Sequence, residues 1–250
     1  MQRTLLIDGD EFVYVSCAAV EYEAAWDEQN VILASNKAEA WDVLQFAVKK
    51  VSDALGDVGD IVFVFGRGSF RKKLYPAYKS NRGGKRPPLC MADVREKVYS
   101  TYPSHSLPDL EGDDTLGILA TNGVYQNPVI VSQDKDMLCV PSALWRKDEL
   151  LLVSQGDADY HWLKQTLTGD SSDGYPGCPG VGPVGAEKLL NEFVRPEGGF
   201  ETKAAWEAVV RTYEAKGLTA DDALVQARLA RILRASDWDE KKQEVILWHP

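Results

Sequence analysis

Short apolar runs, two of which lead directly into acidic residues, recur along the first part of the chain. The segments "TLLIDGD" (4–10), "DIVFVFG" (60–66) and 129–131 are dominated by Leu, Ile, Val and Phe, which predicts buried strands. Acids follow the first run in "IDGD" and the third in "SQDKDM". The segments "ALWRK" (143–147) and "ELLLVS" (149–154) are two further short strand candidates.

Segments with helical spacing of apolar residues alternate with these runs. Residues 37–55 predict an amphipathic helix, and 111–123 predict a second one with acids in its first turn. Further helices are expected over 157–169, 201–217 and 219–236. Strands that alternate with helices predict an α/β fold with a mostly parallel, doubly wound sheet. Ligands bind at the carboxyl ends of the strands in such sheets, so the acids at the strand ends are expected to meet there.

Composition is that of an ordinary globular protein. With 250 residues, of which 44% are hydrophobic and 26% charged, the chain is long enough for one large domain or two small ones. No apolar run approaches the roughly 18 residues of a membrane span, and we expect neither membrane insertion nor a secretory signal. The four cysteines form no C-x-x-C pair and there are three histidines, which argues against a zinc site.

Charge is segregated along the chain. The net charge is −10, which at first argues against a polyanionic partner, yet residues 66–86 contain eight basic residues and no acidic one. Phe70, Tyr75 and Tyr78 are interspersed among these cations, and this mixture suits phosphates and unpaired bases. A solubilising surface loop is the alternative, although such loops normally mix charges of both signs.

Acidic residues from four segments form a second candidate constellation: Asp8, Asp10, Glu111, Asp113, Asp114, Asp134, Asp136, Asp170 and Asp173. Each alone is explained by helix-dipole compensation or by turn formation. Gathered at one edge they would repel, because two unit charges ~4 Å apart cost about 4 kcal/mol at an effective dielectric of about 20. Either several of them hold protons, or divalent cations lie among them. A ligand set made of carboxylate oxygens, in a chain with few histidines, favours Mg²⁺ or Mn²⁺.

Glycine and proline crowd the segment "GDSSDGYPGCPGVGPVG" (169–185). Within it and just beyond, "PGVGPVGAEKLL" (179–190) predicts a helix–hairpin–helix whose tight turn lies at 179–182. Exposed hairpin amides and a helix N-terminus bind phosphate without reading base sequence. Asp170 and Asp173, three residues apart at the end of the preceding helix, are expected to face the same way.

Five motifs in order carry a family resemblance: "IDGD", "SFRKKLYPAYKSNR", "EGDD", "SQDKDM" and "TGDSSDGYPGCPGVG". The chain resembles the flap-endonuclease/5′-nuclease superfamily over nearly its whole length, and within it the T7-like bacteriophage 5′→3′ exonucleases. The resemblance implies a PIN-like, mostly parallel sheet flanked by helices in residues 1–155, with a helical arch at about 67–105. It implies a helical region over 156–250 that contains the helix–hairpin–helix.

The resemblance also implies an activity and its partners. The expected reaction is metal-dependent hydrolysis of phosphodiesters at 5′ ends and 5′ flaps of duplex or branched DNA, with RNA in RNA–DNA hybrids as a further substrate. Two Mg²⁺ ions are implied, with Mn²⁺ as a substitute, and K⁺ at the hairpin. A monomer without membrane attachment, in the cytoplasm of a phage-infected bacterium, is expected.

Roles for individual residues follow from the same resemblance. The first metal is expected on Asp8, Glu111, Asp113 and Asp114, and the second on Asp134, Asp136, Asp170 and Asp173. All of these except Asp170 are also expected to be catalytic, together with Lys79 and Arg82. DNA contacts are expected from Arg71, Tyr78, Lys79 and Arg82 in the arch, and from Gly180, Val181, Gly182 and Gly185 in the hairpin.

One position departs from the family pattern. Members usually carry an aspartate just after the second strand, whereas Val64 or Gly66 stands there in "IVFVFGRGSF". Asp10, Asp60 and a water molecule are the candidates to compensate for it, and we expect an active enzyme that needs more Mg²⁺ or prefers Mn²⁺. A non-catalytic, structure-specific DNA-binding protein, a PIN-like ribonuclease and a purely structural α/β protein are the alternatives.

Overall fold

The computed structural model describes residues 2–25, 30–84 and 86–250, and it describes Arg82 by its backbone only. Six strands form the central sheet: β1 (Arg3–Asp8), β4 (Val58–Val64), β5 (Ser104–His105), β6 (Pro128–Val131), β7 (Ala143–Arg146) and β8 (Glu149–Leu152). They lie in the order β5-β4-β1-β6-β7-β8. All neighbours are parallel except β8, which runs antiparallel to β7 at one edge.

The central strand β1 shows why its sequence is an unbroken apolar run. Leu5, Leu6 and Ile7 have no exposed surface. Successive side chains of a strand point to opposite faces, so Leu6 belongs to one hydrophobic cluster while Leu5 and Ile7 belong to the other. Because helices cover both faces of this sheet, neither set of positions is polar.

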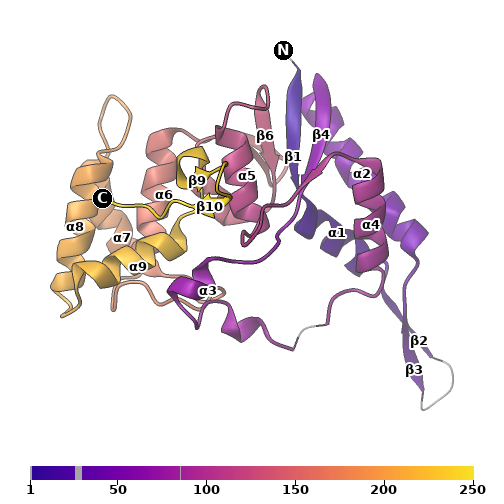
Figure 1. Ribbon diagram of the computed structural model, residues 1–250, viewed down its shortest axis with the longest axis horizontal. Coiled ribbons are helices and arrows are strands. Elements are labelled where there is room, and N and C mark those ends of the chain that lie inside the picture. The colour runs from indigo at the N-terminus through magenta and orange to yellow at the C-terminus, as the bar shows by residue number, and fades with distance from the viewer. Residues whose placement is uncertain (1, 26–29, 85) are drawn as a thin grey trace.

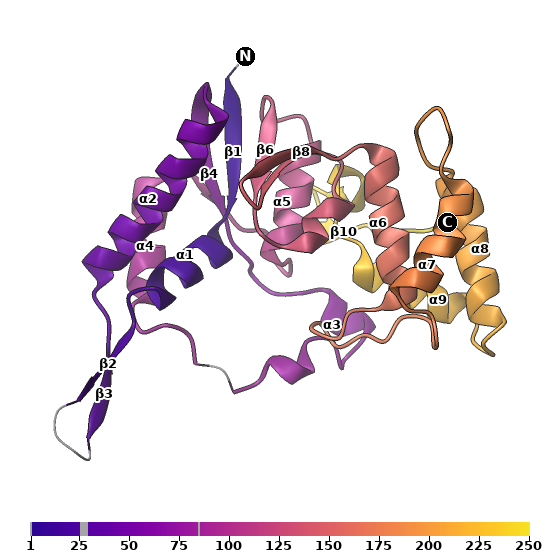
Figure 2. The same cartoon turned by 180° about the vertical axis from the view of Figure 1, so that it is seen from behind.

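Three helices pack over the face that buries Leu5 and Ile7: α1 (Gly9–Ala18), α2 (Lys37–Leu55) and α4 (Met91–Thr101) (Figures 1 and 2). The structure gives α2 the bounds that the sequence predicts. Its N-terminus is capped by Asn36, whose side chain accepts a hydrogen bond from Ala38 N at 3.0 Å.

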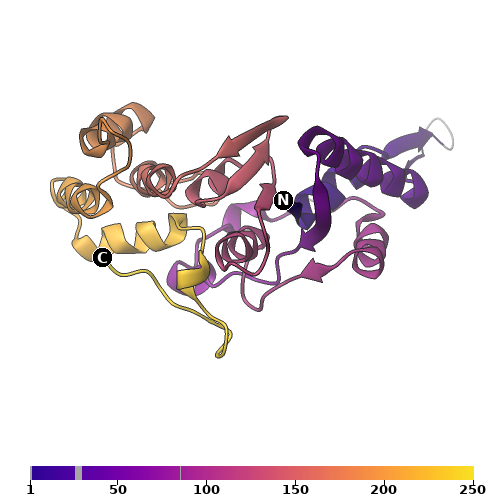
Figure 3. The same ribbon diagram turned by 90° about the horizontal axis from the view of Figure 1, so that it is seen from above.

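Helices α5 (Gly112–Thr121) and α6 (Gln155–Thr168) cover the opposite face. The chain continues into α7 (Pro183–Leu190), α8 (Thr202–Glu214) and α9 (Ala220–Ala230). Seen from above, these last helices extend the molecule on the side away from α1, α2 and α4 (Figure 3). One hydrophobic cluster contains residues of both the sheet and these helices, so the core is continuous across residue 155. The division into two regions at that point stays a prediction.

Shorter elements complete the described chain. They are the pair β2 (Tyr22–Ala25) and β3 (Val31–Ala34), the pair β9 (Trp238–Asp239) and β10 (Glu244–Val245), the one-turn helix α3 (Arg71–Leu74), and 3₁₀ turns at Ser80–Arg82, Lys135–Cys139, Asn191–Phe193 and Ala235–Asp237. The β2–β3 hairpin, which the sequence did not predict, projects beyond α1 and α2 (Figure 1). Among the described helices, none is long and apolar enough to span a membrane.

The predicted arch is helical only in part. Within 67–105, α3 and the 3₁₀ turn at Ser80–Arg82 are separated by a turn over 76–79, in which Lys79 is left-handed. Helix α4 also falls in this range, but Val94 and Val98 bury it against the body of the protein. The chain between α3 and α4 therefore loops away from the sheet before returning to it (Figure 2).

Candidate active site

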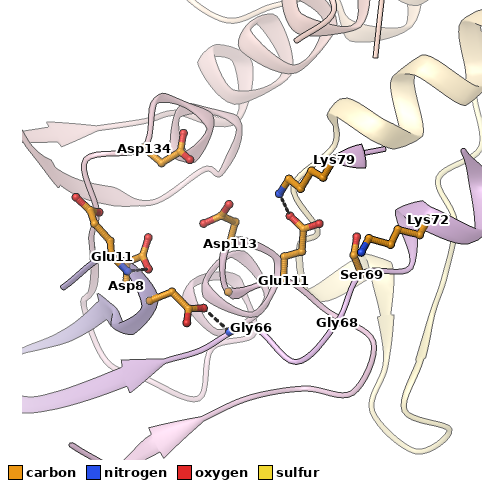
Figure 4. A pocket seen from close by; sticks show the side chains of 12 residues that line it. Asp8, Glu11, Gly66, Gly68, Ser69, Lys72, Lys79, Glu111, Asp113 and Asp134 are labelled. Atoms are coloured by element: carbon orange, nitrogen blue, oxygen red, sulfur yellow. Dashed lines mark hydrogen bonds and ion pairs between the residues drawn. The ribbon is translucent and has the colours of Figure 1, made fainter. Parts of the chain in front are cut away.

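A cavity of about 550 Å³ opens at the carboxyl end of β1. Three segments bring acids to it: Asp8 ends β1, Asp113 lies in the first turn of α5, and Asp134 follows β6. Figure 4 shows these carboxylates around one space. We call it the acid pocket, and its lining is Asp8, Asp10, Glu11, Gly66, Gly68, Ser69, Lys72, Lys79, Glu111, Gly112, Asp113 and Asp134.

Asp8 is held rigidly where β1 ends. Its Oδ1 accepts a hydrogen bond from Glu11 N at 3.0 Å and so caps α1, and its Oδ2 accepts one from Ser132 Oγ at 3.0 Å. Burial, with repulsion from Glu11 and Asp134, raises the pKa of Asp8 to about 6. A strand end followed at once by a capped helix therefore fixes this carboxylate at the floor of the pocket.

Asp113 and Glu111 enter the acid pocket from the start of α5. Burial, with the charges of Asp8 and Asp134, raises the pKa of Asp113 well above its usual range. Burial acts on Glu111 in the same direction, but the nearby Arg71 and Lys79 cations lower the pKa of Glu111 overall. The acids are thus unequal: Asp8 and Asp113 crowd one another, whereas Glu111 is neutralised by a cation.

Lys79 and Tyr78 join the arch to the acids. Lys79 Nζ forms an ion pair with Glu111 and lies 3.5 Å from Asp173 Oδ2. The Tyr78 hydroxyl donates to Asp173 Oδ2 at 2.8 Å, and the Tyr78 side chain is only 2% exposed. Tyr78, which the resemblance placed against DNA, is thus buried and supports Asp173. Lys79 lines the acid pocket, and its predicted place beside the scissile phosphate stays a prediction.

Asp136 and Asp170 form a separate cluster outside the acid pocket. Gln165 Nε2 donates to Asp136 Oδ1 at 3.0 Å and lies 3.4 Å from Asp170 Oδ2. Lys135 Nζ lies 2.8 Å from Asp170 Oδ2. Burial raises the pKa of Asp136 to about 6, while Asp170, despite burial, has its pKa lowered to about 2 by hydrogen bonds from Lys135 and Ser172. The four acids expected around one second metal are therefore spread over three places.

Asp114 and Arg71 lie together in the protein interior. Asp114 is fully buried, Arg71 is 1% exposed, and two hydrogen bonds of 2.6 and 2.8 Å join them. Arg71 also donates to the carbonyls of Leu229 and Arg231, and Leu233 N donates to Asp114. This arrangement gives neither the metal-ligand role expected for Asp114 nor the DNA contact expected for Arg71. It gives both a structural role, linking α3 and α5 to the end of α9.

Gly66, one of the two positions at which the resemblance leads us to expect an aspartate, is covered by another carboxylate. Asp10 Oδ2 accepts a hydrogen bond from Gly66 N at 2.7 Å, and Arg95 pairs with Asp10. A Cβ atom on Gly66 would lie 3.2 Å from Asp10 Oδ2 and 3.1 Å from Gly112 N. Asp60 pairs with Thr4 in the strand register, near the opposite end of β4. Asp10 therefore lies at the site, whereas Asp60 does not.

Several residues of this region were missed by the sequence reasoning. Glu11 Oε2 accepts from Ser132 Oγ at 3.1 Å and from Gln133 N at 2.8 Å, and so ties α1 to the end of β6. Its position beside Asp10 was an available signal. Gln165 carried no such signal, because a glutamine within a helix is ordinary. The predicted role of Arg82 rests on a side chain outside the described residues.

The predicted hairpin joins α6 to α7. Gly180 adopts φ +74°, and Val181 N donates to Cys178 O at 3.1 Å, so that amide is already used. Gly182 caps α7, and Gly185 lies in its first turn, where backbone amides have no acceptor within the helix. The structure thus leaves the Gly185 amide, rather than that of Val181, suited to a phosphate.

Gly169 lets the end of α6 pass close to the backbone of Pro176 and Gly177 at the start of the hairpin. Gly169→Ala should therefore destabilise the fold. Its φ is +67°, and an added Cβ would lie 2.4 Å from Pro176 C. We expect a loss of about 2 kcal/mol or more in the free energy of unfolding, measured in urea. Gly83→Ala is the matched control, since Gly83 has φ −64° and open space around its Cβ direction. Equal stability of the two variants would contradict this packing.

The donor set of the acid pocket fits a hard divalent cation. Its acidic side chains supply carboxylate oxygens, and its lining in the described part of the chain includes no histidine or cysteine. A cation would relieve the repulsion that contributes to the raised pKa values of Asp8 and Asp113. Within the described ranges, no three His, Cys, Asp or Glu side chains stand in an arrangement that already encloses one ion.

Comparisons with known proteins agree on one family. The model described as "5′-3′ exonuclease, N-terminal resolvase-like domain" matches residues 3–147. The exodeoxyribonuclease of Enterobacteria phage T3 is 30% identical to this chain, and the match covers 98% of this chain and 92% of the phage T3 protein. The exonuclease of Escherichia phage T7 is 28% identical over 98% of this chain and 93% of its own.

The solved structures agree on the fold. The T5 D15 protein co-crystallised with metal ions is 12% identical and has a TM-score of 0.65, over 92% of this chain and 90% of that chain. The predicted fold class and the predicted superfamily are both confirmed. The chain belongs to the 5′-3′ exonuclease family, within the flap-endonuclease/5′-nuclease superfamily.

Proposed function

We propose that the chain is a divalent-metal-dependent 5′→3′ exonuclease and 5′-flap endonuclease that hydrolyses phosphodiesters of duplex or branched DNA. The observation that carries this is the acid pocket, in which carboxylates from three segments face the arch residue Lys79. A protein that only bound DNA would gain nothing from acids held beside the place where a phosphate must lie.

Mg²⁺ is the metal we propose, with Mn²⁺ as a substitute. Asp8, Glu111, Asp113 and Asp134, with Asp10 close by, would hold metal in the acid pocket, and Asp136, Asp170 and Asp173 are the remaining acids for a second ion. When bound, the metal would neutralise phosphate charge and lower the pKa of water. K⁺ at the hairpin is part of the proposal.

The chain's own residues prepare the substrate. Lys79, 17% exposed, is held at the pocket wall by Glu111 and is placed to bind a non-bridging oxygen of the phosphate. Ser132 and the Glu11 amide keep the Asp8 carboxylate from turning away. The hairpin amides would hold duplex phosphates at a set distance from the pocket.

The partners we propose are DNA 5′ ends and flaps, with RNA–DNA hybrids as further substrates. A monomer is expected, acting in the cytoplasm of a phage-infected bacterium. The test is a 5′-labelled flap duplex, a matched RNA–DNA hybrid and single-stranded RNA, each incubated with Mg²⁺ or with EDTA. Flap cleavage with Mg²⁺ alone supports the proposal. Binding without cleavage would indicate a DNA-binding protein, and cleavage of RNA alone would indicate a ribonuclease.

Asp10→Asn tests the compensation at Gly66. If Asp10 supplies the charge that the family aspartate provides elsewhere, its loss should weaken Mn²⁺ binding by about 10-fold or more, as loss of a supporting carboxylate does at other metal sites. Calorimetry with Mn²⁺ measures this without substrate. Unchanged Mn²⁺ affinity in Asp10→Asn would contradict compensation by Asp10. Wild-type activity that saturates at low micromolar Mg²⁺ would count against the separate expectation of a weak metal site.

A further inference from the structure

The wall of the acid pocket opposite Asp8 and Asp134 is formed by the segment that connects β4 to α3 and by α3 itself. Gly66, Gly68, Ser69 and Lys72 all line the cavity (Figure 4). Gly68 adopts φ +133°, and a Cβ atom there would lie 3.1 Å from Asp109 Cα. The chain therefore passes tightly over the loop before α5, and this brings the next residues to the pocket.

Two polar groups of this wall have capacity for a further partner. Ser69 Oγ is buried and has no hydrogen-bond partner of normal geometry in the described part, although the hydroxyl is close enough to Glu111 to help lower its pKa. The Lys72 ammonium, in the same described ranges, forms no ion pair and no hydrogen bond. A buried hydroxyl whose contact with a carboxylate falls short of a normal hydrogen bond keeps capacity for a ligand oxygen.

Lys72 differs from the other cations nearby. Lys79 is neutralised by Glu111 at the same pocket. Lys73, the next residue, points elsewhere: it pairs with Asp109 at 2.6 Å and lines a separate cavity with Phe70 and Leu74. Lys72 is therefore the cation of α3 that faces the acids without being held by one.

We propose that Lys72, with Ser69, binds a backbone phosphate of the cleaved strand next to the phosphate under attack. This inference rests on the proposed function. The acids and Lys79 define where the reacting phosphate lies, and the wall of Ser69 and Lys72 extends the pocket along the strand. An ammonium and a hydroxyl that line the same wall of one pocket form a charge-assisted site for a phosphate oxygen. The contact is to substrate, so Lys72 is a substrate-binding residue and not a metal ligand.

Lys72→Ala and Lys73→Ala form a matched pair, because each removes one positive charge from adjacent exposed positions of α3. Binding to a 5′-flap duplex is measured by fluorescence anisotropy in EDTA. We expect Lys72→Ala to weaken DNA binding roughly tenfold. The slope of the logarithm of the binding constant against the logarithm of salt concentration should fall by the amount that about one phosphate contact contributes. Lys73→Ala should stay within about twofold. Thermal melting of both variants checks that the fold is intact.

A phosphate-specific readout completes the test. Neutral methylphosphonate linkages are placed singly along the cleaved strand near the junction. At one position the substitution should weaken binding by wild type and Lys73→Ala but not by Lys72→Ala. Equal penalties in all three proteins, or equal affinities of the two variants, would overturn the role of Lys72. If wild type cleaves the flap normally in that case, the proposed function stands. Wild type that neither binds nor cleaves would overturn both.

Discussion

Asparagine at position 113 is expected to abolish phosphodiester cleavage while leaving the protein more stable. Asp113 lies in the acid pocket, where burial and the charges of Asp8 and Asp134 raise its pKa. Since the folded state disfavours this charge, the neutral amide should raise the midpoint of thermal unfolding. The same change removes a carboxylate that we propose as a metal ligand, so single-turnover cleavage should fall by about 10³-fold or more. DNA binding in EDTA should be retained.

Asp60→Asn is the control for this variant. Asp60 is an exposed acid near the start of β4, away from the carboxyl ends of the strands where the pocket opens. Cleavage and stability should both stay near wild type. If Asp113→Asn is more stable than wild type but still cleaves DNA at the wild-type rate, Asp113 does not take part in the reaction. A loss of cleavage with a loss of stability would indicate a structural role for Asp113.

Alanine at position 114 is expected to destabilise the protein by about 3–5 kcal/mol, because it leaves the buried Arg71 cation without its partner. The two side chains are 1% and 0% exposed, so water does not replace the lost contact. Urea unfolding in EDTA measures the effect without any contribution from metal. Asp53→Ala, which breaks the exposed pair with Lys49, should cost about 1 kcal/mol or less.

This experiment also separates two roles for Asp114. A metal ligand would affect stability chiefly when metal is present, through the binding free energy. If Asp114→Ala is as stable as wild type in EDTA and loses only the stabilisation that Mg²⁺ provides, the resemblance-based role is right and the buried pair is unimportant. Restoration of stability by Arg71→Met in the Asp114→Ala background would support the buried pair further.

The fold was largely predictable because its signals are local. Leu5, Leu6 and Ile7 are all apolar since both faces of the sheet are covered, and period-2 alternation is absent for that reason. The helix at 37–55 carries its own cap and its own apolar stripe. The β2–β3 hairpin was missed because its strands are mostly exposed, and no buried face imposes a pattern on them.

The candidate site was predictable at the level of segments more than of individual residues. Strand ends converge in a parallel sheet, and Asp8, Asp113 and Asp134 do line one pocket. Neighbouring residues on a helix point in directions about 100° apart, so Asp113 and Asp114 face different surroundings. The partner of Asp114 is Arg71, 43 positions away in the chain, and no local pattern announces such a pair.

Asp10 and Lys72 show what depends on three-dimensional packing. The carboxylate of Asp10 lies over Gly66 only because β1 and β4 are neighbours in the sheet. Lys72 and Lys73 are indistinguishable in the sequence, and the start of α3 sends one to the acid pocket and the other to Asp109. Spacing alone gives no reason to choose between them.

The most direct test of the acid pocket as the catalytic site is cleavage of a 5′-flap duplex in ¹⁸O-labelled water with Mg²⁺, followed by mass spectrometry of both products. Wild type should place one ¹⁸O atom on a 5′-phosphate and leave a 3′-hydroxyl, Asp60→Asn should do the same, and Asp113→Asn should release no product above the level seen in EDTA. Products that end in 3′-phosphate, or equal cleavage by wild type and Asp113→Asn, would contradict the account.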